Sequence, residues 1–227
     1  MATAVMRLVV GVIAGLCAGL IAPDFGRRVT GISLRSLIRS KSRSRFSLEA
    51  VAVTAIFCAV FVLVSLTIES WAVVVAGWVL ALGLLTASWI DVHSHRLPRN
   101  LSYLTFSAGV PVLIVAAAVD DDLSRLASSM IGIVVATILI GLLYLVGRGA
   151  MGSGDFRLAP VIGLFTGWIS VETVLLALVA SFLFAAIFAI ALLASGRANR
   201  RDEIPLGPFL ALGTIAAFVY AASVSGL

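Results

Sequence analysis

Residues 71–91 read WAVVVAGWVLALGLLTASWID, a run of apolar and small residues that ends at Asp91. A run of about 20 such residues is long enough to cross the hydrocarbon core of a bilayer as an α-helix. Seven further apolar runs lie on either side of it, at 5–22, 50–68, 101–119, 126–147, 156–170, 173–194 and 205–224. The sequence therefore predicts an all-α, polytopic integral membrane protein with about eight transmembrane helices, organised as a single membrane domain over 1–227.

The composition supports this fold class. Of the 227 residues, 61% are hydrophobic and 12% are charged, whereas a soluble domain carries about 45–50% apolar and 25% charged residues. The excess falls in the apolar runs, which excludes a soluble globular enzyme, a disordered tail and a secreted disulfide scaffold. The net charge of +5 is concentrated between the runs, where basic residues meet lipid headgroups, so we expect the bilayer and not nucleic acid as the partner of these charges.

The basic residues predict the orientation. Fourteen of the 16 Lys and Arg residues fall in four connections that eight spans would place on one side: 23–49, 91–100, 148–157 and 195–204. By the positive-inside rule that side is cytoplasmic, both termini are outside, and 23–49 is a basic cytoplasmic loop. The sixth run is short enough to be a re-entrant segment, but that alternative would move the last basic connection outside, so the charge distribution favours a full span.

Two aspartates stand at the predicted cytoplasmic ends of apolar runs. Asp91 closes the run 71–90, and Asp155 precedes the run 156–170. An ionisable group beside hydrocarbon is costly unless water or a partner compensates it, so each aspartate is a candidate functional residue. The alternative is that each is a solvated residue at a helix end, where the cost is much smaller.

The residues near these aspartates are those that interrupt helices. Gly152 and Gly154 allow positive φ angles and close approach of another segment, and a segment that can unwind where it lines a water-filled cavity would present both a carboxylate and free backbone groups. Prolines that end or begin helices stand in the neighbouring connections, and they are Pro98, Pro205 and Pro208.

Two carboxylates around one water molecule have a defined chemistry. They share one proton because both cannot ionise comfortably at short distance. One carboxylate takes a proton from the water while the other polarises the scissile carbonyl, and the roles exchange as the amine leaves. The proton belongs to the pair, so neither aspartate is assigned as acid or base.

These residues resemble a known family. Gly152-Ser-Gly-Asp155 is the GxGD motif of the membrane aspartic proteases, and residues 151–159 resemble the extended motif of the bacterial type IV prepilin peptidases, with Arg157 at the usual lysine. Asp91 with Pro98 resembles the first-aspartate motif of that family, and residues 204–213 resemble its late I-P-x-G-P stretch. The likeness covers roughly 75–215. The presenilin branch of the GxGD proteases fits poorly, because its Tyr-Asp and Pro-Ala-Leu motifs are missing.

The resemblance implies a membrane aspartic endopeptidase with a catalytic core at about 71–215 and with neither a metal nor a cofactor. It implies that Asp91 and Asp155 are catalytic. It also implies that a further set of residues shapes the loops or the substrate site: Gly152, Ser153, Gly154, Arg157, Pro98, Pro205, Gly207 and Pro208. The implied substrates are prepilin-like proteins, which carry a short basic leader followed by an apolar helix and are cut at the cytoplasmic interface.

The connection 23–49 distinguishes this chain within the resemblance. Many prepilin peptidases carry a cytoplasmic insertion there with paired CxxC motifs, associated with zinc and N-methylation. Here the segment is short, basic and free of cysteine. It resembles the compact prepilin peptidases of Flp/Tad-type pilus systems and of archaeal preflagellin processing, which implies cleavage without methylation.

Other functions are compatible with parts of the pattern. Glycine-broken helices with aspartates also describe ion-coupled transporters or channels, and a non-catalytic membrane subunit of a secretion or pilus machine would need neither aspartate. His93 and His95 form an HxH pair that could bind a metal with Asp91, although a solvated loop is the simpler interpretation. Aromatic residues of the kind found at membrane interfaces lie near run ends, and they are Trp71, Trp89 and Trp168.

Overall fold

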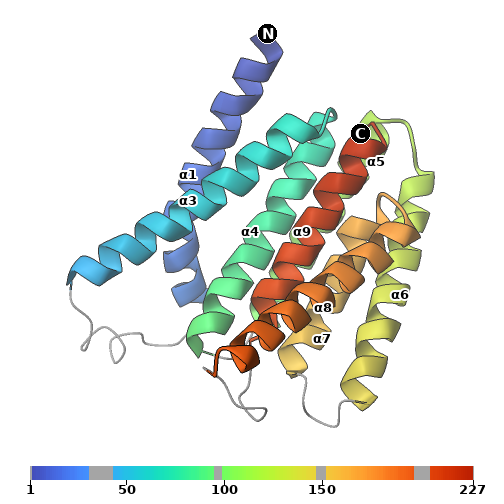
Figure 1. Cartoon of the computed structure of the whole chain (residues 1–227). Coiled ribbons are helices and arrows are strands. Elements are labelled where there is room, and N and C mark those ends of the chain that lie inside the picture. Colours follow the sequence, from blue (N-terminus) through green and yellow to red (C-terminus); the bar gives the residue numbers. More distant parts are fainter. Residues whose placement is uncertain (1, 31–42, 95–98, 147–151, 197–204, 227) are drawn as a thin grey trace.

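The structure, a computed structural model, describes residues 2–30, 43–94, 99–146, 152–196 and 205–226. Within these ranges all the regular secondary structure is helical (Figure 1). The helices are α1 (Ala2–Thr30), α3 (Arg43–Thr67), α4 (Trp71–Ser94), α5 (Arg99–Val119), α6 (Ser124–Val146), α7 (Ser153–Gly167), α8 (Val171–Ala194) and α9 (Gly207–Val224). Each predicted apolar run forms one of these helices, which confirms the all-α membrane fold.

Seven of the described helices are long and apolar enough to cross a membrane, and α7 is the exception. Its 15 residues span about 22 Å at 1.5 Å per residue, which is less than the thickness of the hydrocarbon core. The chain nevertheless reverses direction at both ends of α7. The ends of α4, α6 and α8 and the beginnings of α7 and α9 therefore lie at one end of the bundle, while the N- and C-termini lie at the other (Figure 1).

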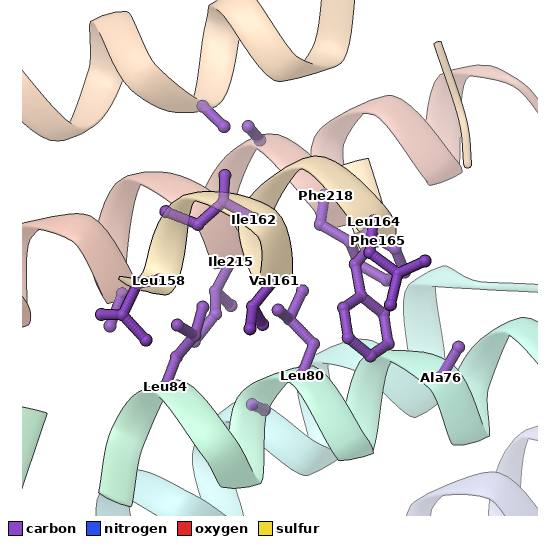
Figure 2. Close-up of a cluster of buried hydrophobic side chains, with 14 of the residues drawn as sticks. Ala76, Leu80, Leu84, Leu158, Val161, Ile162, Leu164, Phe165, Ile215 and Phe218 are labelled. Carbon is purple, nitrogen blue, oxygen red and sulfur yellow. The ribbon is translucent and has the colours of Figure 1, made fainter. Parts of the chain in front are cut away.

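The centre of the bundle is formed by α4, α7 and α9. Buried side chains from the three helices interlock there (Figure 2), and they are Ala76, Leu80, Leu84, Leu158, Val161, Ile162, Leu164, Phe165, Ile215 and Phe218. By contrast, α1, α6 and α8 expose many large apolar side chains, as expected of helices that face lipid. The short helix α7 is thus enclosed by longer helices, so its position is fixed by protein contacts.

Glycines bring α6 and α7 into backbone contact. A Cβ atom on Gly163 would lie 2.3 Å from the carbonyl oxygen of Gly132, and one on Gly132 would lie 2.6 Å from the Cα of Gly167. Such spacing admits no side chain, and Gly163 and Gly167 are four residues apart on one face of α7. This is the small-residue packing that lets membrane helices approach closely.

The pair α1 and α3 packs in the same way at the edge of the bundle. A Cβ atom on Gly15 would lie 2.6 Å from the Cα of Cys58, and one on Gly19 would lie 2.6 Å from the Cα of Thr54. The helices extend into the connection predicted at 23–49, to Thr30 and from Arg43. Residues 31–42 lie outside the described ranges.

The interpretation of Trp168 as an interfacial aromatic residue is wrong. Its side chain is fully buried, and the guanidinium of Arg125 lies 5.9 Å from the ring centroid. Trp168 stands at the C-terminal end of α7. Because α7 is short and enclosed by other helices, this end contacts protein, whereas the end of a longer helix would contact lipid headgroups.

Candidate functional site

Both predicted catalytic aspartates are buried at the same end of the bundle. Asp91 is on the last turns of α4 with 7% of its surface exposed, and Asp155 is on the first turn of α7 with 6% exposed. An ionisable side chain is rarely so buried without a partner or a functional reason. The alternative interpretation, a solvated residue at a helix end, does not describe either carboxyl group.

The start of α7 sets the position of Asp155. Gly152 is the N-cap residue, and the backbone N–H of Asp155 donates to the Gly152 carbonyl at 3.1 Å. A Cβ atom on Gly152 would lie 3.3 Å from Oδ2 of Asp155. Gly152 has φ −63° and ψ 138°, values open to any residue, so it does not adopt the positive φ that glycine allows. The absence of a side chain at Gly152 leaves room beside the carboxyl group of Asp155.

Burial and the neighbouring charge act together on Asp155. The pKa of this carboxyl group is raised from 3.8 to about 7, mainly by burial and also by the charge of Asp91, while a hydrogen bond with the Gly152 backbone acts in the opposite direction. Asp155 lies outside the seven helices that qualify as membrane spans. The charge of Asp91 thus acts on the carboxyl group of Asp155, as expected of two carboxyl groups that share a proton.

The first residue of α9 contacts Asp91 directly. The N–H of Gly207 donates to Oδ2 of Asp91 at 2.9 Å. A Cβ atom on Gly207 would lie 2.7 Å from that oxygen, so only glycine allows the backbone this close. Helix α9 thereby brings the late proline-glycine motif against the first aspartate, although the two are far apart in sequence.

The other predicted site residues are distributed around these contacts. Gly154 is half-buried in the first turn of α7, Arg157 is half-buried one turn further on, and Ser153 begins the helix. Pro205 and Pro208 flank Gly207, with Pro208 in the first turn of α9 as expected. Pro98 lies outside the described residues.

One site residue was not predicted. Ser88 donates from Oγ to the carbonyl of Gly207 at 3.3 Å and to the carbonyl of Leu84 at 2.7 Å. It stands three residues before Asp91, which places both side chains on one face of α4. The spacing of three residues could have indicated that Ser88 lies beside Asp91, but it could not have indicated the hydrogen bond of Ser88 to Gly207 on α9.

A metal site finds no support in the described part of the chain, where no three His, Cys, Asp or Glu side chains are grouped to hold an ion. His93 donates from Nδ1 to the carbonyl of Trp89 at 2.8 Å, and the centroids of the His93 and Trp89 rings lie 4.1 Å apart. His95 lies outside the described residues.

The fold and the site define an integral membrane protein with two buried aspartates at one end of a helical bundle. Residues 78–190 match the sequence model of the type IV leader peptidase family. The chain belongs to this family, which confirms the resemblance found in the motifs. No solved structure matched the chain.

Curated relatives agree with the family match. The chain is 28% identical over 169 residues to a prepilin leader peptidase/N-methyltransferase of Aeromonas salmonicida, covering 72% of this chain and 55% of the relative. It is 26% identical over 136 residues to the Bacillus subtilis protein of the same description, covering 59% of this chain and 51% of the relative. The chain thus spans about half the length of the curated relatives it matches.

Proposed function

We propose that this chain is a membrane aspartic endopeptidase that removes the short basic leader of prepilin-like proteins. The observation that carries the proposal is the pair of buried aspartates, Asp91 and Asp155, at one end of the bundle in a chain of the type IV leader peptidase family. The relatives from Aeromonas salmonicida and Bacillus subtilis are named as prepilin leader peptidases, which supports the same reaction for this chain.

The chemistry follows from the pair. Asp91 and Asp155 hold one proton and one negative charge between them and activate a water molecule. The water oxygen attacks the peptide carbonyl carbon while the ionised carboxylate accepts a water proton and the protonated one donates to the carbonyl oxygen. The tetrahedral intermediate then collapses: its C–N bond breaks, the nitrogen leaves with the proton that the pair holds, and one hydroxyl proton of the intermediate returns to the pair, which restores the starting state. No side chain forms a covalent bond to the substrate.

The location of the site fits such a substrate. The connections at the aspartate end of the bundle carry most of the basic residues, so this end faces the cytoplasm under the positive-inside rule. A prepilin-like protein keeps its basic leader in the cytoplasm and its apolar helix in the bilayer. The scissile bond would then reach the membrane interface at the depth of Asp91 and Asp155.

Co-expression tests the proposal. The chain is produced with a candidate prepilin in a host that lacks its own prepilin peptidase, and leader removal is followed by gel shift and by the mass of the new N-terminus. We expect cleavage by the wild type and none by Asp91→Asn or Asp155→Asn at equal protein levels. Asp121→Asn, in the connection between α5 and α6 at the other end of the bundle, is the matched control and should cleave normally.

Two results would speak against the proposal. Cleavage at the wild-type rate by either dyad variant would exclude the paired mechanism. Absence of cleavage with several prepilins, in membranes that contain folded wild-type protein, would favour a transporter or a non-catalytic subunit. The mass of the product also reports methylation, which we do not expect from this chain.

A further inference from the structure

Gly207, the first residue of α9, is held at both of its backbone polar groups by α4. Its N–H donates to Oδ2 of Asp91 at 2.9 Å, and its carbonyl accepts from Oγ of Ser88 at 3.3 Å. The two α4 residues are three positions apart and lie on one face of the helix. Gly207, Ser88 and Asp91 therefore form a closed arrangement, which we call the Gly207 clamp.

The local sequence makes this contact possible. The first N–H groups of a helix have no partner within the helix, so the N–H of Gly207 is available to a carboxylate. Pro208 follows and brings no N–H of its own. A Cβ atom on Gly207 would lie 3.1 Å from both Cβ and Cγ of Asp91 as well as 2.7 Å from Oδ2. The absence of a side chain thus brings the backbone of α9 onto the carboxylate.

We propose that Ser88 is a positioning residue for the aspartate pair. By holding the Gly207 carbonyl, it fixes the Gly207 N–H against Asp91 and so sets the direction in which this carboxylate faces Asp155. The inference rests on the proposed function and adds a residue to it. Ser88 touches neither the substrate nor the water in this account, so its loss should lower kcat with little change in KM.

The chain contains a matched control for this contact. Ser181 on α8 donates to the carbonyl of Ala177 at 2.7 Å and to the carbonyl of Leu210 on α9 at 3.4 Å. Both serines thus donate to a carbonyl of their own helix and to one of α9, but Ser181 contacts α9 at Leu210, about one turn beyond Gly207. Gly213 of α9 lies against Ser181, because a Cβ atom on Gly213 would lie 2.3 Å from Oγ of Ser181. The amide of Gly213 can therefore report on Ser181.

The test combines kinetics with a spectroscopic signal that needs no substrate. The sequence contains three Leu-Gly pairs, so labelling leucine with ¹³C at the carbonyl and glycine with ¹⁵N selects the amides of Gly83, Gly207 and Gly213 in the purified full chain. Ser88→Ala should shift the Gly207 amide and leave Gly213 in place. Ser181→Ala should do the reverse.

The kinetic expectation follows from the loss of one hydrogen bond. Ser88→Ala should lower kcat about 3- to 10-fold, and Ser181→Ala should change it by less than about 2-fold. Ser88→Thr and Ser88→Val have nearly the same shape but only threonine keeps the hydroxyl. We expect threonine to restore kcat and the Gly207 signal, and valine to behave like alanine. This second pair decides the question if the alanine variant does not fold.

The two readouts separate failure of this inference from failure of the proposed function. If Ser88→Ala or Ser88→Val leaves the Gly207 amide unchanged, or lowers kcat no more than Ser181→Ala, the positioning role is refuted. If wild type cleaves no prepilin while the Gly207 amide still responds to Ser88 and not to Ser181, the clamp stands and the proposed reaction falls.

Discussion

Gly163→Ala should lower the stability of the protein, against the usual effect of this substitution. Alanine in place of glycine within a helix ordinarily stabilises by about 0.5–1 kcal/mol. Here the new Cβ would lie 2.3 Å from the Gly132 carbonyl oxygen and 2.6 Å from the Cα of Ile133. Both are backbone atoms of α6, so α7 must move by about 1 Å to reach normal contact distances. Overpacking of this kind costs about 1–3 kcal/mol.

The assay is thermal unfolding of the purified protein in detergent, with Gly141→Ala as the control. Gly141 lies on the same helix pair, but its Cβ would meet only the ring edge of Phe156, at 3.1 Å, and that ring is partly exposed and can turn. We expect the melting temperature to fall by several degrees for Gly163→Ala, at about 2–4 °C per kcal/mol, and to stay level or rise for Gly141→Ala.

The same variant should also lose activity. Asp155 stands on α7 two turns before Gly163, so a displaced helix carries the carboxyl group with it, and a shift of about 1 Å costs on the order of 100-fold in rate. A rise in melting temperature for Gly163→Ala would refute the backbone contact between α6 and α7. Unchanged cleavage by a destabilised variant would refute the view that this contact positions Asp155.

Two further predictions concern charge. The pKa of Asp155 is raised in the folded protein, so the folded protein binds this proton more tightly than the unfolded chain does, and the free energy of unfolding falls as pH rises from 3.8 to about 7. Chemical unfolding of wild type and Asp155→Asn across this pH range should show a smaller fall in the variant. Identical pH profiles would contradict a buried carboxyl group that holds a proton. The Arg7 guanidinium donates to the carbonyls of Ser65, Ile68 and Glu69 at the end of α3 and lies 5.0 Å from the Trp71 ring centroid. Lysine cannot reproduce these several hydrogen bonds, so Arg7→Lys should lower the melting temperature by a few degrees without changing kcat. Equal stability of the variant would show that the Arg7 contacts contribute no net free energy.

Much of the fold was predictable because a bilayer dictates the length of an apolar helix. The run 71–90 needs no tertiary information to be recognised, and the same holds for the other long runs. The sequence could not show that α7 is enclosed, because lipid-facing and protein-facing positions of membrane helices are both apolar. For this reason the sequence predicts an interfacial position for Trp168, whereas its side chain is fully buried.

The site was predictable to the extent that it is written in local motifs. Asp91 and Asp155 were identified from their positions at the ends of apolar runs and from the GxGD motif, and both are buried. The contact between Asp91 and Gly207 joins residues 116 positions apart. Only the packing of α9 against α4 creates it, and Ser88 gains its second partner from the same packing.

A double-mutant cycle on the two aspartates tests the central claim most directly. The kcat/KM for one prepilin is measured with purified wild type, Asp91→Asn, Asp155→Asn and the double variant, at equal folded fraction. Because the two carboxyl groups act as one unit, each single variant should lose as much activity as the double variant. If either single variant keeps substantial activity, or if the two losses multiply in the double variant, the aspartates act independently and the shared-proton mechanism is wrong.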